Sequence, residues 1–428
     1  MSDVNSYFSS TGQSLNVPIN NVLVNSATAG SGGDDTEQVI DIVEAVSMAP
    51  ALSQVRVYIA PCSSFSGNEC TNFAQGVSDV DIFNKMATEN IAKQLSVSFA
   101  WSSADTSSND PIFKEFAVQG QSLFVASGDS GAYVTGDLTY PAEDPLVTAV
   151  GGTDLVTNGA AGSWSSETGW SGSGGGTSLH GIAIPNYQAI SGVITSQNHG
   201  STTLRNIPDV AAEANTDNFG CANGTCFNTL GGTSLAAPTW AGFMALVNQQ
   251  AALGGQAPVG FLNPPIYDNI RTLHDITSGS NGGETAVTGY DLVTGWGSPS
   301  GSGLITGLAT NGSCGYVRPG GFLPSGATVT SCDGRFELVM QSTDGNLVLY
   351  FNGSPLFNFA TNGNSGNFAT MQDDGNFVVY SPQGTAVFNT QTGGGAHAGA
   401  FLAVQSDGNL VVYDPGLKPL WNSMTGGH

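Results

Sequence analysis

Three similar segments in the C-terminal part of the chain restrict the fold more than any other feature of the sequence. They are Thr343–Tyr350 (TDGNLVLY), Gln372–Tyr380 (QDDGNFVVY) and Gln405–Tyr413 (QSDGNLVVY). Counted between Asp344, Asp374 and Asp407, their spacing is 30 and 33 residues. Short alternating strands with Asp-Gly-Asn turns at such a period indicate a repeat architecture. The sequence therefore predicts an all-β domain over residues 312–428.

The preceding part of the chain, residues 1–311, has another pattern, in which apolar strand-like runs alternate with helix-like segments. The strand-like runs are Val55–Ala60, Leu95–Ala100 and Leu123–Ala126, and the helix-like segments are Asp35–Met48, Asp81–Gln94 and Ser234–Ala251. This alternation predicts an α/β domain with a parallel sheet covered on both faces. In such sheets, functional residues gather at the carboxyl ends of the strands.

The charge of the chain limits its partners. Only 10% of the 428 residues are charged, and 9 Lys plus Arg against 33 Asp plus Glu give a net charge of −24. Such a surface repels phosphates and anionic lipids, which excludes nucleic acid as a partner, and no apolar run is long enough for membrane insertion. An acidic, charge-poor surface suits a secreted, extracellular protein that acts at low pH. The N-terminus lacks a basic or apolar leader, which indicates a processed or truncated front end.

The six cysteines occur as three close pairs, Cys62 with Cys70, Cys221 with Cys226 and Cys314 with Cys332. None of the pairs has Cys-x-x-Cys spacing and no histidines accompany them, which argues against zinc. Although six cysteines permit fifteen pairings, we expect three local disulfides.

The segment Gly231–Pro238 (GGTSLAAP) contains the candidate nucleophile, Ser234, at the start of an apolar helix. Free backbone N–H groups and the helix dipole favour anionic intermediates at such a position. A serine before a helix is often only an N-cap, but the surrounding motif favours a nucleophile.

A serine nucleophile needs a base, and the five histidines do not stand in a suitable motif. Glu37 and Asp41 lie four residues apart, so on a helix their carboxyl groups share one face and favour a shared proton. Asp129 follows the strand Leu123–Ala126 and could donate a hydrogen bond to an oxyanion if it is protonated. Acidic residues in a first helical turn, or in a Ser-Gly-Asp-Ser-Gly turn, can also be purely structural.

Together these residues resemble the sedolisin family of serine-carboxyl peptidases over roughly residues 4–309. The resemblance implies a subtilisin-like fold, with Ser234 as nucleophile, Glu37 as general base and acid, Asp41 as the group that tunes Glu37, and Asp129 as oxyanion donor. It also implies a peptide-binding cleft lined by Trp101, Gly174, Gly175 and Gly176. Mature family members start with a further sheet strand, whose absence here would leave a sheet edge uncovered.

The same resemblance implies a Ca²⁺ site near the end of the α/β domain. Its ligands would be the carboxylates of Asp275 and Asp291 and the carbonyl groups of Ile276, Val287 and Gly289. Oxygen ligands of this kind suit a hard cation, although aspartates in glycine-rich loops are more often turn residues.

Five residue identities recur on one strand face in the last two repeats of the C-terminal domain. They are Gln372, Asp374, Asn376, Val378 and Tyr380 in one, and Gln405, Asp407, Asn409, Val411 and Tyr413 in the other. The polar groups can converge on sugar hydroxyls while valine packs on the ring carbons, although Val and Tyr could instead be core residues. The pattern resembles the bulb-type mannose-binding lectins, a β-prism fold, and implies mannose-type glycans as partners.

The first repeat departs from this pattern because Ser342 stands where glutamine is expected. Gln341 is one position early and belongs to the opposite face unless a bulge intervenes. We therefore expect this pocket to be weak or lost.

The leading interpretation is an acid-acting serine-carboxyl endopeptidase that acts on proteins or peptides and is held near glycans by its lectin domain. The first alternative is a carbohydrate-binding protein with an inactive, truncated peptidase domain. A neutral subtilisin-type protease is disfavoured, because the chain lacks a His-Gly-Thr segment.

Overall fold

A computed structural model of the protein describes all residues except 26, 28–34, 67–68, 74–78, 160–161, 186, 190–191, 255–257, 269–272, 310–314, 318, 332–334, 406 and 415–417, and except the side chains of 62–66 and 69–73. The chain forms two compact units, Met1–Ala309 and Thr310–His428. The predicted domain boundary, between residues 311 and 312, lies outside the described residues.

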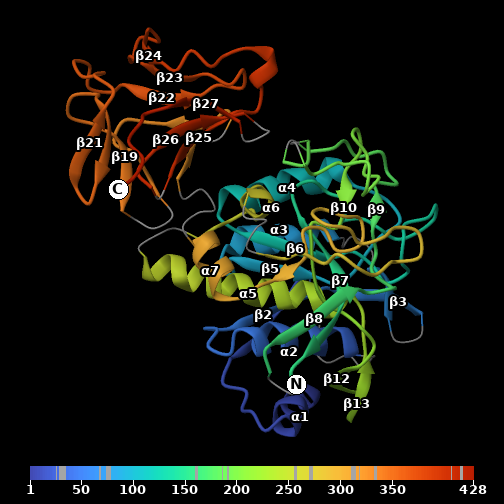
Figure 1. The fold of residues 1–428 in the computed structure, drawn as a ribbon. Helices are drawn as coiled ribbons and strands as arrows, with labels where there is room; N and C mark the ends of the chain where they lie inside the picture. The colour runs from blue at the N-terminus through green and yellow to red at the C-terminus, as the bar shows by residue number, and fades with distance from the viewer. Residues whose placement is uncertain are drawn as a thin grey trace. The chain divides into compact units, whose positions relative to one another are not determined.

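A five-stranded sheet forms the centre of the first unit (Figure 1). Four strands run parallel in the order β11-β7-β6-β5, and the fifth, β8, pairs antiparallel with β7. Their bounds are β5 Gln94–Val97, β6 Ser122–Ala126, β7 Thr148–Thr157, β8 Trp164–Gly169 and β11 Val210–Glu213.

The other strands of this unit form two-stranded sheets. The pairs are β1 (Ile19–Leu23) with β2 (Val55–Ile59), β3 (Cys62–Ser66) with β4 (Glu69–Phe73), β9 (Gly176–Thr177) with β10 (Asn206–Ile207), β12 (Asn218–Ala222) with β13 (Thr225–Leu230), and β14 (Leu273–His274) with β15 (Ser298–Pro299). The helices are α1 (Ser2–Ser10), α2 (Thr36–Met48), α3 (Asp79–Glu89), α4 (Thr106–Val118), α5 (Thr233–Leu253), α6 (Asn263–Asp268) and α7 (Ser302–Ala309).

Both faces of the central sheet are covered, as the sequence predicts. All five residues of β6 are buried. Leu123 and Val125 belong to a core cluster formed with α3 and α4, while Phe124 and Ala126 belong to a second cluster formed with α5. Because successive side chains of a strand point to opposite faces, the two clusters lie on opposite sides of the sheet.

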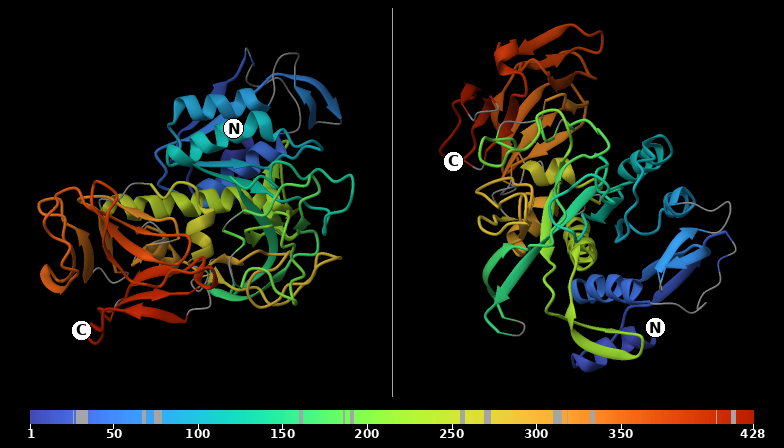
Figure 2. Two further views of the ribbon diagram at one scale, coloured as in Figure 1. Left: turned by 90° about the horizontal axis from the view of Figure 1, so that it is seen from above. Right: turned by 90° about the vertical axis from the view of Figure 1, so that its right-hand side faces the viewer.

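Helix α5 carries no charged residue and is apolar around most of its circumference, which is typical of a buried helix. It packs against α2, as Figures 1 and 2 show. A Cβ atom at Gly242 of α5 would lie 2.7 Å from the carbonyl oxygen of Ala45 and 2.8 Å from Cβ of Met48. Glycine at this position therefore permits the close approach that brings the acidic face of α2 to the start of α5.

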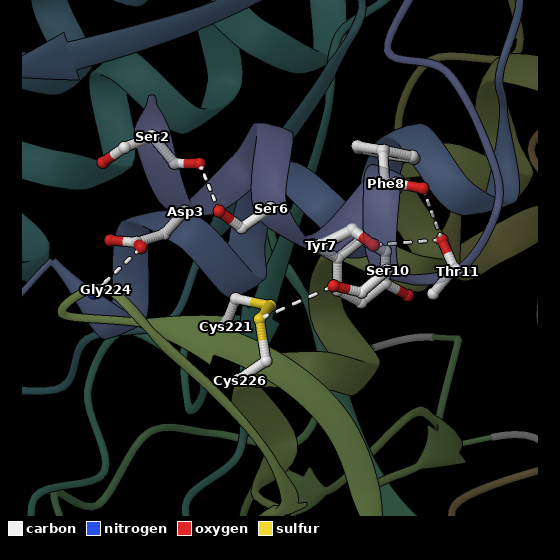
Figure 3. Close-up of a disulfide and its surroundings, with 10 residues drawn as sticks. All are labelled: Ser2, Asp3, Ser6, Tyr7, Phe8, Ser10, Thr11, Cys221, Gly224 and Cys226. Carbon is white, nitrogen blue, oxygen red and sulfur yellow. Dashed lines mark hydrogen bonds between the residues drawn. A yellow bond between two sulfur atoms is a disulfide. The ribbon is translucent and has the colours of Figure 1, made fainter.

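A disulfide joins Cys221 and Cys226 across the β12–β13 hairpin (Figure 3), which confirms one of the three predicted pairs. The N–H of Gly224 in the same hairpin donates a 3.0 Å hydrogen bond to Asp3 of α1. The cysteine side chains of the other two predicted pairs lie outside the described residues. Among the described residues, no helix is both long and apolar enough to cross a membrane.

The second unit consists of three four-stranded antiparallel sheets, one for each sequence repeat. The sheets are β18-β19-β20-β21, β17-β22-β23-β24 and β16-β25-β26-β27. Inward-facing residues of all three sheets, such as Leu349, Val379 and Val412, share one core. This arrangement confirms the predicted all-β prism.

The bounds in this unit are β16 Tyr316–Val317, β17 Phe322–Leu323, β18 Thr328–Thr330, β19 Phe336–Met340, β20 Leu347–Phe351, β21 Ser354–Asn358, β22 Phe368–Met371, β23 Phe377–Tyr380, β24 Ala386–Asn389, β25 Phe401–Val404, β26 Leu410–Tyr413 and β27 Pro419–Asn422, with a short 3-10 helix at Gly395–His397.

Candidate active site

Ser234 lies in the first turn of α5 and is largely buried, with 8% of its surface exposed. The helix begins after Gly232, whose φ of 134° is a backbone conformation that favours glycine. A Cβ atom at Gly232 would also lie 2.8 Å from Oδ2 of Asp129. The glycine thus lets the loop that carries Asp129 come close to the turn that carries the serine.

Asp129 is fixed to the same turn by hydrogen bonds. The backbone N–H and the hydroxyl of Thr233 donate to its Oδ1 over 2.7 and 2.9 Å. The N–H of Gly128 in turn donates to the Thr233 hydroxyl over 3.0 Å. Oδ1 thus anchors Asp129 to the turn that carries Ser234, and the role of Asp129 as oxyanion donor stays a prediction.

Ser98 connects the acidic face of α2 with the helix that carries Ser234, a role that the sequence analysis missed. Its hydroxyl donates to Oδ1 of Asp41 over 2.6 Å and lies 3.5 Å from the backbone oxygen of Ser234. Ser98 directly follows β5, so its place at the carboxyl end of a parallel strand was the signal that could have revealed it.

The carboxyl group of Glu37 affects the ionisation of Asp41 one turn along α2. Burial raises the pKa of Asp41 well above its usual range, and the charge of Glu37 raises it further, while the hydrogen bond from Ser98 lowers it. Burial and the Glu37 charge thus favour the protonated form of Asp41, while the shared proton itself stays a prediction. The pair can accept a proton from a nearby hydroxyl and return it.

His180 is engaged elsewhere and does not act as the base. Its Nδ1 lies 3.2 Å from Oε1 of Glu143, and its Nε2 lies 3.1 Å from the backbone oxygen of Ser102. The acidic pair on α2 thus remains the candidate base for Ser234.

Two of the predicted cleft residues, Gly174 and Gly175, bond to the segment that carries Asp129. The N–H of Gly174 donates to the carbonyl group of Gly128 over 2.7 Å, and the carbonyl group of Gly175 accepts from Tyr133 over 2.8 Å. Gly176 begins β9, and Trp101 forms a bridge to Tyr140 with an N–H···O distance of 2.7 Å. These glycines support the loop that carries Asp129, and their contact with a substrate remains a prediction.

The last two repeats of the prism hold the predicted sugar-binding side chains together. The Gln372 amide donates to the Tyr380 hydroxyl over 2.9 Å, and Gln405 donates to Tyr413 over the same distance. Asp374 and Asp407 each accept the N–H of the asparagine two residues on, over 3.0 and 2.9 Å. Val378 and Val411 are buried on the same strands but lie outside the core cluster of the prism.

The first repeat keeps its glutamine on the pocket side, so the placement of Gln341 on the opposite face was wrong. Gln341 donates to the Tyr350 hydroxyl over 2.5 Å, and its N–H bonds to the carbonyl group of Asn346, as in the other repeats. The extra residue is taken up in the turn that follows Gln341, between β19 and β20. However, the Asn346 amide donates to Asn358 over 3.1 Å and Asn346 is only 6% exposed, so we still expect weaker binding here.

Comparison with known proteins identifies the family of the first unit. A model of the subtilase family matches residues 5–257. The chain belongs to this family. Sedolisin of Pseudomonas sp. (strain 101) is 32% identical over 304 residues, which cover 62% of this subtilase and 48% of that relative. The chain spans about half the length of the curated relatives it matches.

A solved structure of Pseudomonas sedolisin, a serine-carboxyl proteinase complexed with two molecules of pseudo-iodotyrostatin, matches 73% of this subtilase and 89% of that chain. The identity is 29% and the TM-score 0.57, which confirms the predicted subtilisin-like fold. A lectin from Japanese Marasmius oreades is 38% identical over 26% of this chain and 91% of its own, with a TM-score of 0.24.

In the loop predicted to bind Ca²⁺, the two aspartates accept hydrogen bonds from backbone N–H groups of the same loop. Asp275 accepts the N–H of Gly289 over 3.0 Å, and Asp291 accepts those of Val287, Val293 and Thr294 over 2.8–3.1 Å. Burial raises the pKa of Asp291 to about 7. No cluster of three or more His, Cys, Asp or Glu side chains occurs in the described part, so a site here depends on two carboxylates and backbone carbonyls. That donor set fits a hard cation.

A further buried carboxyl group of α2, Glu44, was missed by the sequence analysis, although it lies on the face of Glu37 and Asp41. Its pKa is raised from 4.5 to about 7, chiefly by burial, and the charge of Glu213 acts in the same direction. A 3.3 Å hydrogen bond from Thr239 of α5 opposes these effects.

We expect Glu44 to make the stability of this subtilase fall with rising pH. Since folding raises its pKa, the folded state binds the proton more tightly than the unfolded state. Its contribution is therefore full below about pH 4.5 and is lost as the pH rises through about 7, at a cost of about 3 kcal/mol. The variant Glu44→Gln should show a smaller loss between pH 4 and 7 in urea unfolding, whereas Glu115→Gln on an exposed position of α4 should not. Equal losses in all three proteins would contradict this assignment.

Proposed function

We propose that this chain is an acid-acting serine-carboxyl endopeptidase. The observation that carries the proposal is the contact of Ser98 with both Asp41 and the backbone of Ser234. It holds the acidic face of α2 against the start of α5, with Asp129 bound to the neighbouring residue Thr233.

The proposed reaction uses four side chains. The Ser234 hydroxyl attacks the peptide carbonyl carbon and gives its proton to Glu37, while Asp41 supports the Glu37 charge through the shared proton. Protonated Asp129 donates to the oxyanion. Collapse breaks the C–N bond, and Glu37 protonates the leaving amine. Water then hydrolyses the acyl ester by the same proton transfers in reverse order.

This mechanism requires acid. Asp129 must be protonated, and Glu37 and Asp41 must hold one proton between them, so activity should disappear once all three are ionised. Hydrolysis of an unfolded protein should therefore be faster in acid than at neutral pH. A maximum at neutral pH would contradict the proposal. A folded sample that binds sugar but hydrolyses nothing at any pH would leave carbohydrate binding as the function.

We propose that the prism binds mannose-type glycans through the pockets of Gln372 and Gln405. The double variant Gln372→Ala/Gln405→Ala should weaken binding of methyl α-mannopyranoside at least about tenfold, since each change removes the partner of a pocket tyrosine. Gln341→Ala, the matched change in the first repeat, should have a smaller effect in calorimetric titration. The assignment would be contradicted if Gln341→Ala weakened sugar binding as much as the double variant does, or if the double variant bound the sugar as tightly as the parent chain.

We propose Ca²⁺ as the cation of the Asp275–Asp291 loop, with Asp275, Ile276, Val287, Gly289 and Asp291 as its ligands. Bound Ca²⁺ would fix the end of the α/β unit, and at 100 times its Kd it would stabilise the fold by about 2.7 kcal/mol. At pH 6 a chelator should lower Tm by roughly 5–10 °C. In Asp275→Asn the chelator should have little effect, and an unchanged Tm in the parent chain would contradict the proposal.

We also propose that the protein is secreted and acts outside the cell, where the lectin unit keeps the peptidase near mannosylated material. The Cys221–Cys226 disulfide and the net charge of −24 support this location. Tethering raises the local substrate concentration without changing the chemistry. Removal of surface mannose from a glycoprotein substrate should therefore slow its cleavage.

A further inference from the structure

Two rows of aromatic side chains extend from the two complete sugar pockets. In one, the Tyr380 ring stacks on Phe368 at 5.6 Å, and Phe368 contacts Phe322 at 5.2 Å between ring centroids. In the other, Tyr413 contacts Phe401 at 5.8 Å and Phe401 contacts Tyr316 at 5.4 Å. Each row starts at the tyrosine whose hydroxyl accepts the hydrogen bond from the pocket glutamine. We call them the aromatic platforms.

The platforms lie on the outer faces of their sheets. The residues that alternate with them along the strands, such as Leu323, Ala369 and Leu402, belong to the core of the prism. Phe322 is 60% exposed and Tyr316 is 39% exposed. The outermost ring of each platform therefore offers an apolar surface to solvent next to a polar pocket.

The prism does not need these aromatic residues in order to fold. In the sheet of the first repeat, the residue opposite Tyr350 is Glu337, and the position that corresponds to Phe322 and Tyr316 is Thr328. That sheet has the same strand order and shares the same core. The aromatic rows thus accompany the two pockets whose asparagines are more accessible, and are absent from the one whose Asn346 is buried.

We propose that each aromatic platform binds the further sugar units of an oligosaccharide whose first mannose lies in the adjoining pocket. This inference rests on the proposed sugar binding. A pyranose ring has an apolar C–H face, which suits an aromatic ring, and hydroxyl groups at its edge, which suit the polar pocket. The continuity of each platform with a pocket tyrosine favours a glycan chain over a second copy of the protein. The chain should therefore prefer oligomannose to a single mannose unit.

The test compares a linear α-linked mannotriose with methyl α-mannopyranoside in calorimetric titrations of the full chain. The parent chain should bind the trisaccharide at least about tenfold more tightly, as aromatic contact of this size allows. The double variant Phe322→Ala/Tyr316→Ala should bring the two affinities within about threefold, with the affinity for the monosaccharide unchanged. Val387→Ala, a matched change of an exposed apolar residue on β24, should keep the preference.

Four results would overturn the inference. One is an undiminished preference for the trisaccharide in the double variant. Another is a loss of self-association in that variant with sugar binding unaltered, which would make the platforms an interface between copies. If the parent chain binds neither sugar, the proposed lectin function fails and the platforms fail with it. Binding of both sugars with equal affinity by the parent chain overturns the platforms alone.

Discussion

Glu37→Gln should lower kcat/KM for peptide hydrolysis about 10²–10⁴-fold, the usual contribution of a general base. The amide cannot take the proton of the Ser234 hydroxyl, and it also removes the charge that helps to keep Asp41 protonated. Initial rates on a fluorogenic peptide near pH 4 would measure the effect. Far-ultraviolet circular dichroism would show that the variant is folded.

Glu44→Gln is the matched control, because it makes the same change two turns further along α2. At pH 4 Glu44 is largely protonated, since burial raises its pKa to about 7, and glutamine resembles that form. Activity should therefore persist in Glu44→Gln. Comparable losses in both variants would show that the helix face, and not the carboxyl group of Glu37, is needed for activity.

Asp209→Asn should lower the free energy of unfolding by about 3–5 kcal/mol, the usual cost of breaking a buried ion pair from one side. Asp209 and Arg205 are both fully buried, and their two contacts measure 2.5 and 2.9 Å. Asp209 also accepts the N–H of Ala149 over 2.8 Å and the Tyr267 hydroxyl over 2.9 Å. The substitution would leave the Arg205 charge buried without its counter-charge.

A double-mutant cycle tests this interpretation. The double variant Arg205→Met/Asp209→Leu should lose less free energy of unfolding than the single variants Arg205→Met and Asp209→Leu together. The reason is that neither buried charge remains in the double variant. Urea unfolding at pH 5 would give the values. A loss below about 1 kcal/mol for Asp209→Asn, or strict additivity in the cycle, would contradict the assignment.

The sequence could reveal those parts of the site that depend on local spacing. The four-residue step from Glu37 to Asp41, and Ser234 in the first turn of an apolar helix, follow from helix geometry alone. Asp129 could be placed because it follows a buried strand. The repeats likewise revealed three sheets, since alternation and turn residues determine a strand and its end.

Tertiary contacts account for what the sequence analysis missed. Ser98 contacts both Asp41 and Ser234 because α2 and α5 pack closely, and burial in the folded chain is the largest cause of the raised pKa of Glu44. The predicted helix Asp81–Gln94 ran too far: α3 ends at Glu89, before Asn90 at a φ of 46°, and Gln94 starts β5. Asparagine in this backbone conformation commonly ends a helix.

The first repeat shows that the residue pattern also does not determine the conformation of a turn. A strict period of two moves Gln341 to the wrong face, but the turn that follows it absorbs one extra residue. The contact with Tyr350 is therefore preserved. Whether an inserted residue lies in the strand or in the turn depends on the loop's own hydrogen bonds, which the residue pattern alone does not show.

Hydrolysis of an unfolded protein at pH 4 by Ser234→Ala tests the central claim most directly. Ser302→Ala is its matched control, because Ser302 also stands at the start of a helix, α7, but is exposed. We expect Ser234→Ala to be folded and to have no measurable activity, while Ser302→Ala should cleave at the rate of the parent chain. Cleavage by Ser234→Ala at a rate near that of the parent would show that the nucleophile lies elsewhere.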